Sequence, residues 1–153
     1  MGETWKLRLW TFLRVPMAFF LSPTVVESLA RRSVIRIPLT WRSKNHLGSM
    51  YFGALCVGAD LAGGLLALRR IEESGRKISL IFKDVQGRFW KRVEGDALFT
   101  CDDGEAISEL VHRVIASGER EEQHVRVVVT VPEKLGEEPV AEFVLTLSLK
   151  RRD

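Results

Sequence analysis

Apolar side chains recur at helical spacing over the first twenty residues of the chain. Apart from one adjacent pair they lie three or four positions apart, with Lys6, Arg8 and Arg14 between them, at Trp5, Leu9, Phe12, Leu13, Met17 and Phe20. This spacing predicts an amphipathic helix within residues 1–22. Such a helix either docks on the body of the domain or lies on a membrane surface through its basic flanks and aromatic anchors.

Runs rich in β-branched and aromatic residues predict the strands of a sheet. They cover residues 24–30, 33–41, 77–93 and 96–101, and two long strands joined around residues 134–138 fill the last third of the chain. A second amphipathic helix ends at Gly118. Its apolar stripe consists of Ile107, Leu110, Val111, Val114 and Ile115.

The segment KNHLGSMYFGALCVGADLAGGLLALRR, residues 44–70, is small or apolar almost throughout. It predicts a polar loop followed by the longest helix, from Ser49 as the N-cap to Glu73, closed by Ser74-Gly75. Strands gathered around this helix without regular alternation of strands and helices indicate an α+β fold with an antiparallel sheet. We expect one domain over residues 1–153, with the loop and long helix spanning residues 44–74.

Asp60 is the one carboxylate in this segment, and it shares a side of the helix with Gly53, Val57 and Gly64. An ionised carboxylate out of water is costly unless it is paired or its pKa shifts. Interior glycines cost a helix about 1 kcal/mol each relative to alanine, which predicts a close approach by another backbone. Asp60 is therefore either a hydrogen-bonded structural contact or a base or nucleophile in a ligand cleft beside the amides of residues 50–53.

Charge and cysteine usage narrow the partners. The chain has 153 residues and a net charge of +3, but residues 1–50 carry eight Lys/Arg and two Asp/Glu. This basic N-terminal third of the chain either forms a solvated face or binds an anionic ligand or a membrane surface. Cys56 and Cys101 form no disulfide framework, which favours the cytoplasm. No stretch reaches the ~18 apolar residues of a membrane span, and neither a metal site nor a nucleic-acid module is recognisable.

The pattern NHLGSMYFGALCVGAD carries a resemblance to a known family. With Asn45 and Gly48 in the loop, Gly53 at the helix start and an acid at Asp60, it resembles the hotdog-fold acyl-CoA thioesterases, particularly the phenylacetate-degradation type and a neighbouring uncharacterised branch. The resemblance extends over most of the chain. It implies an antiparallel sheet wrapped around the long central helix, with the N-terminal helix and one further helix as additions.

The resemblance also implies an activity. The substrate would be a coenzyme A thioester, with no separate cofactor, and the sites would lie at the interface of a homodimer or of a tetramer. Asp60 matches the acid that activates water or attacks the thioester, and Asn45 the loop amide that holds the nucleophile or substrate. The amides of Phe52 and Gly53 would form the oxyanion hole. The remaining expected substrate contacts are His46, Gly48 and Tyr51.

One departure from the family pattern keeps alternatives open. Phenylacetate-type enzymes usually show His-Gly-Gly at the helix start, whereas this chain has Tyr51-Phe52-Gly53. A bulky Phe52 would narrow the approach to the helix amides. The chain is thus expected either to hydrolyse acyl thioesters or to bind acyl groups without cleaving them. In one form of the second alternative, the N-terminal helix holds the binding protein at a membrane. A third alternative makes Asp60 a structural contact without any ligand.

Overall fold

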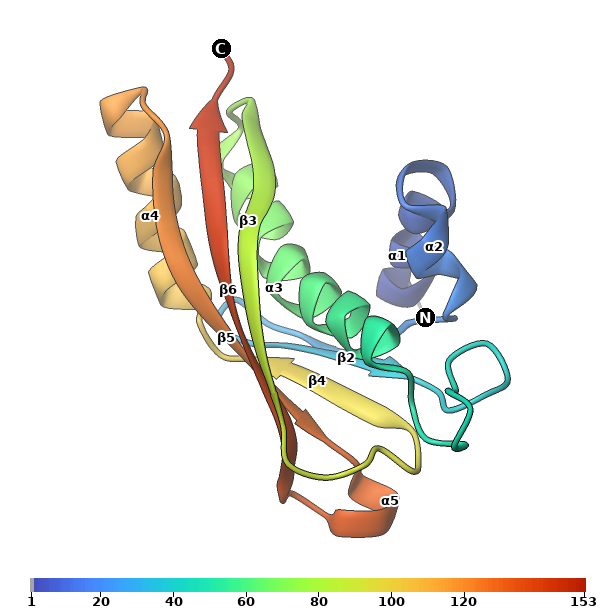
Figure 1. The fold of residues 1–153 in the computed structure, drawn as a ribbon. Coiled ribbons are helices and arrows are strands. Elements are labelled where there is room, and N and C mark those ends of the chain that lie inside the picture. The colour runs from blue at the N-terminus through green and yellow to red at the C-terminus, as the bar shows by residue number, and fades with distance from the viewer. Residues whose placement is uncertain (1) are drawn as a thin grey trace.

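A six-stranded antiparallel sheet forms the frame of the protein, in the order β1-β2-β4-β5-β6-β3 (Figure 1). The computed structural model describes residues 2–153. The strands are β1 (Thr24–Ser28), β2 (Ser33–Ile37), β3 (Ile78–Phe89), β4 (Ala97–Cys101), β5 (Glu121–Thr130) and β6 (Pro139–Arg151). The helices are α1 (Gly2–Arg14), α2 (Pro16–Phe20), α3 (Phe52–Ser74), α4 (Gly104–Ser117) and α5 (Pro132–Leu135). The α+β class predicted from the sequence is confirmed.

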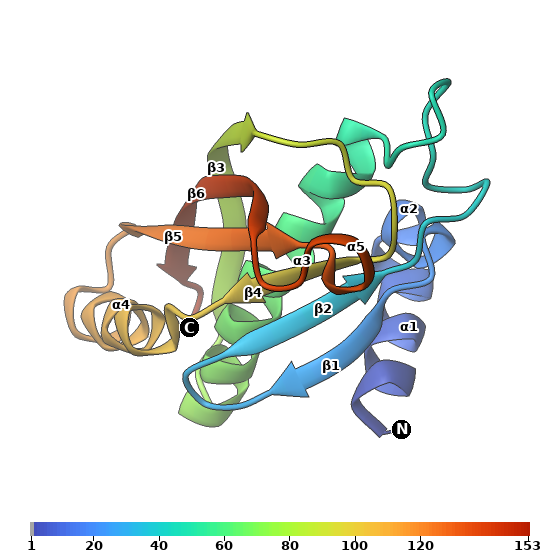
Figure 2. The same ribbon diagram turned by 90° about the horizontal axis from the view of Figure 1, so that it is seen from below.

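The long helix α3 lies in the concave side of the sheet, as expected for the hotdog layout (Figure 2). A Cβ atom on Gly58 would lie 2.3 Å from the ring of Phe99 on β4, so glycine is required where helix and sheet approach closely. By length and composition α3 is apolar enough to cross a membrane, so the expectation that no stretch reaches that threshold was wrong. Half of that apolar window is buried, because α3 is the core helix of the fold.

Helix α4 packs its apolar stripe against α3, β5 and β6, with four of the five side chains buried and only Ile115 partly exposed. Its predicted end is confirmed, since Gly118 adopts a left-handed conformation and its amide donates a hydrogen bond to the carbonyl of Val114. Gly75 closes α3 in the same way. The predicted connection between the last two strands contains the short helix α5.

The N-terminal segment is two helices rather than one, because Pro16 interrupts the pattern after Arg14. Helix α1 docks on β1 through its more polar side. Thr4 Oγ1 accepts a hydrogen bond from the Val25 amide at 3.1 Å, and Arg8 Nε donates one to the Pro23 carbonyl at 3.0 Å. The predicted apolar stripe consequently faces outward, with Trp5 and Leu13 each 67% exposed.

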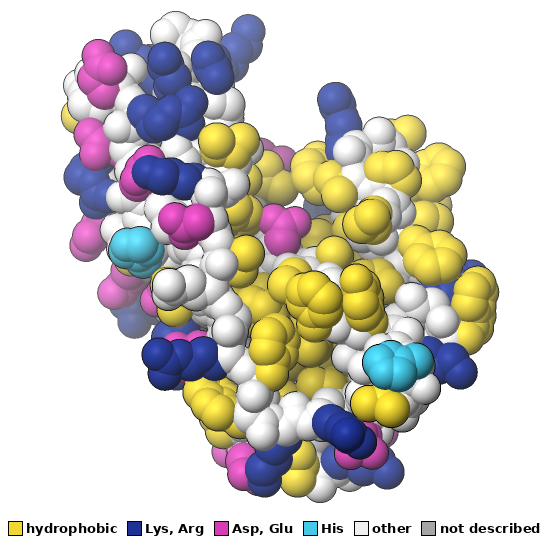
Figure 3. Space-filling model, viewed as in Figure 1, with side chains coloured by type: hydrophobic (Ala, Val, Ile, Leu, Met, Phe, Trp, Pro, Cys, Tyr) yellow, Lys and Arg dark blue, Asp and Glu magenta, His cyan; other side chains and the backbone are white. Residues whose placement is uncertain are grey.

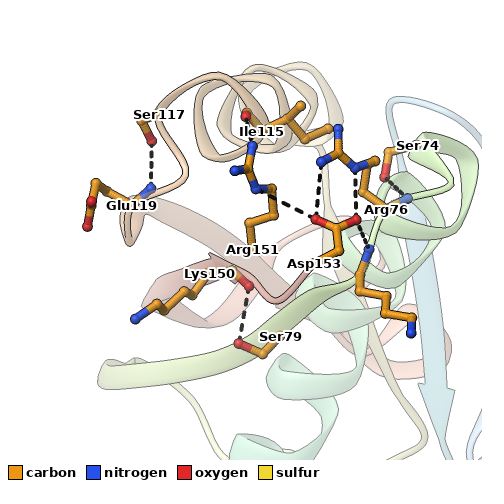
Figure 4. A network of polar contacts seen from close by, with 10 residues as sticks. Ser74, Arg76, Ser79, Ile115, Ser117, Glu119, Lys150, Arg151 and Asp153 are labelled. Atoms are coloured by element: carbon orange, nitrogen blue, oxygen red, sulfur yellow. Dashed lines mark hydrogen bonds and ion pairs between the residues drawn. The ribbon is translucent and has the colours of Figure 1, made fainter.

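The far end of α3 is tied to the end of β6 by a network of polar contacts (Figure 4). Arg76 donates to both carboxylate oxygens of Asp153, at 2.9 and 3.1 Å, and Arg151 donates to the carbonyl of Ile115 in α4 at 2.7 Å. These contacts lower the pKa of the Asp153 carboxyl to about 2, chiefly through the hydrogen bond from Arg76. The network holds α3, α4 and β6 together at the end opposite the helix start.

Candidate functional site

Asp60 lies near the middle of α3, half-buried, in the wall of two neighbouring grooves. The β3 groove has a volume of about 410 Å³ and is lined by Cys56, Val57, Asp60, Phe82, Lys83, Asp84, Val85 and Leu145. The α1–α3 groove is larger, about 800 Å³, and Asp60 also contributes to its wall. The stripe of small residues predicted around Asp60 therefore does open onto space.

The carboxylate of Asp60 has no hydrogen-bond or ion-pair partner among residues 2–153. Burial raises the pKa of the Asp60 carboxyl above its ordinary value, and desolvation is the sole cause. A structural aspartate in such surroundings would normally be paired. A carboxylate that is half-buried and unpaired is instead a better proton acceptor than an ordinary surface aspartate.

The α1–α3 groove follows the helix for more than three turns. One row of its lining lies on α3 at Asp60, Gly64, Leu68 and Glu72, which spans about 18 Å along the helix axis. Apolar side chains line its middle, and the charged residues gather toward the end away from Asp60. The other lining residues are Glu3, Lys6, Leu7, Trp10, Val15, Ser28, Leu61, Leu65, Arg69, Glu73, Ile78 and Leu80. Its size is that of a small-molecule site.

The side chain of Asn45 closes its own loop. Its Oδ1 accepts hydrogen bonds from the amides of Leu47 at 2.9 Å and Ser49 at 3.2 Å, and its Nδ2 donates to Ser49 Oγ at 2.9 Å. Ser49 is thereby engaged with Asn45 and does not cap α3, so the predicted N-cap was wrong; Tyr51 occupies that position. Gly48 has φ +80°, a conformation that glycine adopts without strain, so it shapes the turn.

The helix start retains first-turn amides for a ligand, among them those of Phe52 and Gly53. The amides of Met50 and Tyr51 donate hydrogen bonds to the carbonyls of Val93 and Ser43, each at 2.8 Å. These two amides are therefore not free to bind a ligand, although both belong to the predicted set of residues 50–53. The amides of Phe52 and Gly53 belong to the first turn of α3, where no intrahelical acceptor exists. The ring of Tyr51 lies over this turn, since a Cβ on Gly53 would be 2.4 Å from it.

A third cavity, about 450 Å³, surrounds this helix start. It brings Asn45, His46, Tyr51 and Phe52 together with the chain that leaves β3, Phe89–Val93, and so adds Trp90, Lys91 and Arg92 to the site. Sequence reasoning missed these three residues. The signal was weak, because the end of a predicted strand carries no indication of which loop it meets.

Asp60 and the helix-start cavity are separate within one chain. Gly53 and Asp60 are seven residues apart, which corresponds to about 10 Å along the axis of α3. The predicted cleft that unites Asp60, Asn45 and the first-turn amides is therefore not formed by a single chain. Among residues 2–153, no three His, Cys, Asp or Glu side chains gather in a metal-binding group.

Comparison with known proteins places this arrangement among hotdog folds. The sequence pattern of a family described as a domain of unknown function (DUF4442) matches residues 5–149. No curated protein matches the chain. A protein of unknown function from Pseudomonas aeruginosa, described as a probable thioesterase, is similar with a TM-score of 0.80 and 27% identity, over 97% of this chain and 96% of that one.

Two further solved structures share the fold at lower identity. A protein of unknown function from Chlorobaculum tepidum TLS has a TM-score of 0.85 and 13% identity, over 98% of this chain and 95% of that one. A thioesterase from Haemophilus influenzae has a TM-score of 0.70 and 14% identity, over 94% of this chain and 88% of its own. The resemblance seen in the sequence is thus confirmed at the level of the fold.

Proposed function

The chain belongs to the DUF4442 domain family, within the hotdog-fold thioesterase superfamily, and we propose that it hydrolyses an acyl thioester at a site shared by two copies of the chain. The observation that carries the proposal is Asp60, an unpaired half-buried carboxylate with a raised pKa that faces two grooves of the central helix. The α1–α3 groove, apolar in its middle, would hold the acyl group.

In the proposed reaction Asp60 acts as the general base. It takes a proton from a water molecule whose oxygen attacks the thioester carbonyl carbon. The amides of Phe52 and Gly53 donate hydrogen bonds to the oxyanion that forms. The C–S bond then breaks, the acid is released, and the thiolate leaving group takes up the proton. Asn45 holds the loop that precedes the helix start. Direct attack by Asp60 is the other form of the mechanism, and transfer of one water oxygen into Asp60 would reveal it.

The long edge strand β3 favours a homodimer. One side of its backbone has no strand partner, and an edge of this length invites pairing with another chain. Val85 lies opposite Leu145 and Phe89 opposite Ala141, so both face the core side of the sheet. Yet Val85 and Phe89 remain about half exposed, whereas Leu145 and Ala141 are buried. A second copy paired along β3 would cover them.

Antiparallel pairing of two β3 strands would also complete the site. Asp60 lies level with Phe82 and Val85 of β3, while the helix-start cavity lies level with Phe89 at the end of the same strand. A twofold axis between these levels brings Asp60 of one copy toward the helix start of the other. This arrangement removes the separation of about 10 Å found within one chain.

The first test is thiol release from short, long and aromatic acyl-CoAs. Asp60→Asn should lower the rate about 10²–10⁴-fold, the usual contribution of a general base, without loss of fold. Asp84→Asn is the matched control, because Asp84 lines the same β3 groove but is already bonded to Thr146 Oγ1 at 2.6 Å. Full activity in the Asp60 variant, or loss only in the Asp84 variant, would refute the assignment.

A charged side chain introduced on the core-side face of β3 tests whether the site is shared between two copies of the chain. Val85→Arg should give a monomer in light scattering and abolish thiol release, since each site would lose its second half. Ile81→Arg is the control, because Ile81 lies on the same strand, is similarly exposed, and pairs with Ser148 on the outer face. A dimer that persists in Val85→Arg would exclude pairing along this strand.

A non-catalytic acyl-binding protein is the second candidate. Tyr51 and Phe52 favour it, because their rings pack edge to face at 5.1 Å over the helix start and crowd the first-turn amides. In that case acyl-CoA binds saturably while no thiol is released by native protein. Phe52→Gly, which restores part of the His-Gly-Gly pattern, would then be expected to open the amides and produce measurable hydrolysis.

A further inference from the structure

Seven large apolar side chains form an outward-facing surface on the N-terminal helices and the loop beside them. This aromatic surface consists of Trp5, Leu9, Phe12, Leu13, Met17, Phe20 and Trp41, which are between 45% and 74% exposed. The rings of Phe20 and Trp41 lie 5.8 Å apart, so the loop and α2 parts of the surface touch, and Phe12 of α1 packs on the neighbouring Phe19 of α2 at 5.1 Å. Figure 3 shows hydrophobic side chains gathered over α1 and α2. A patch of this extent marks an interaction site.

The fold does not use this surface. Helix α1 is attached to β1 through Thr4 and Arg8 and buries only Leu7 and Thr11 on that side. Strand β1 is one edge of the sheet, and β3, the strand proposed to pair with a second copy, is the other. The aromatic surface is therefore separate from the proposed dimer contact and from the attachment of α1.

The charges around the aromatic surface are predominantly positive, and the one carboxylate on α1, Glu3, is paired with Lys6 at 3.5 Å. Between Glu3 and Asp60 the only carboxylate is Glu27, which is paired with Arg32 at 3.3 Å. Arg14 follows Leu13 and Arg42 follows Trp41 directly, with Lys44 two residues further on, and for these exposed cations no ion pair occurs among residues 2–153. The guanidinium of Arg42 lies 5.3 Å from the ring centre of Phe20 and 5.5 Å from that of Trp41.

We propose that the aromatic surface docks this protein on an anionic lipid membrane, independently of what reaction the Asp60 site performs. Large aromatic and aliphatic side chains on one side of an amphipathic helix, flanked by Arg and Lys, suit the interface between headgroups and acyl chains. The unpaired cations complement anionic headgroups. Two copies facing each other through this surface would instead bring Arg14, Arg42 and Lys44 of both into mutual repulsion.

Vesicle flotation of the full chain tests the proposal. Native protein should float with vesicles of phosphatidylcholine mixed with phosphatidylglycerol, and far less with phosphatidylcholine alone. Adding salt should weaken the binding. The triple variant Trp5→Gln, Leu13→Gln, Met17→Gln should stay in the aqueous fraction. The matched control changes Val26 and Leu29 to Gln, because both are more than half exposed but lie outside the aromatic surface.

A second variant isolates the charge contribution. Arg14→Gln should lower partitioning onto anionic vesicles about fivefold, with little effect on neutral ones. Far-UV circular dichroism and thermal unfolding establish that each variant is folded. Because the triple variant leaves Asp60 and the helix start untouched, thiol release in lipid-free solution should equal that of native protein, which separates this proposal from the proposed function.

Three results would overturn the docking proposal. The first is native protein that does not float with anionic vesicles. The second is equal flotation of native protein and the triple variant. The third is a lower molecular mass of the triple variant in lipid-free light scattering, because a second copy of the chain would then be the occupant of the aromatic surface.

Discussion

Helices α1 and α4 are both amphipathic and almost equal in length, with 13 and 14 residues, but they present their apolar stripes to opposite surroundings. The stripe of α4 is buried against α3 and the sheet, apart from the partly exposed Ile115, whereas that of α1 faces outward. Polar contacts decide the difference, since Thr4 and Arg8 of α1 hydrogen-bond to the segment around β1. Hydrophobic periodicity thus predicts a helix and its apolar side, but not which side the fold covers.

The largest expected contrast comes from truncating one leucine in each helix. Leu110→Ala in α4 should lower the free energy of unfolding by about 2–5 kcal/mol, because it leaves a cavity at a fully buried position. Leu13→Ala in α1 should change it by less than about 0.5 kcal/mol. Urea denaturation of both variants measures the difference. Equal losses would mean that the outward stripe of α1 is covered in solution.

A smaller effect is expected from the attachment of α1. Arg8→Ala removes hydrogen bonds to the carbonyls of Pro23 at 3.0 Å and Ser22 at 3.4 Å, and should cost about 1–2 kcal/mol. Amide hydrogen exchange should accelerate in α1 and remain unchanged in α4. Arg14→Ala, on the same helix but without a hydrogen bond to β1, is the control. Faster exchange in both helices would show that they unfold as one unit.

The central helix α3 differs from α4, because its packed face includes the carboxylate of Asp60 as well as apolar side chains. The pKa of Asp60 is raised in the folded state, so the folded protein binds more protons than the unfolded chain between the two pKa values. The contribution of Asp60 to stability therefore falls as pH rises through this window. Asp60→Asn should abolish this dependence and raise Tm at neutral pH. Parallel pH profiles of native and variant would contradict a desolvated carboxylate.

The smallest effect is expected at the exposed network near the end of α4. The pKa of Asp153 is lowered to about 2, so its contribution to stability is present above the ordinary aspartate pKa of about 4 and is lost as pH falls toward about 2. Arg76→Ala should leave Tm at neutral pH almost unchanged and raise slightly the pH at which acid unfolds the protein. A large drop in Tm at neutral pH would show that this network contributes as much to stability as the buried stripe of α4.

Much of the candidate site was predictable, and its limits have physical causes. The central helix, its glycines and Asp60 follow from local patterns in one segment, and the family resemblance adds the amides of Phe52 and Gly53. The engagement of the Met50 and Tyr51 amides does not, since their acceptors belong to Val93 and Ser43. The contribution of Trp90, Lys91 and Arg92 could not be predicted either, because these residues meet the helix start only through the tertiary fold. A cytoplasmic location and the absence of a separate cofactor stay predictions.

By itself the sequence determined the order of the strands and of the helices α3 and α4, the α+β class, the glycine-terminated ends of α3 and α4, and the isolation of one carboxylate among small residues. These properties depend on neighbours within one or two turns of helix or along one strand. The tertiary structure alone decided which side of α1 is attached and that the amide of Met50 is taken up by the carbonyl of Val93. Those outcomes depend on contacts between segments distant in sequence, whose geometry exists only once the sheet has curved around α3.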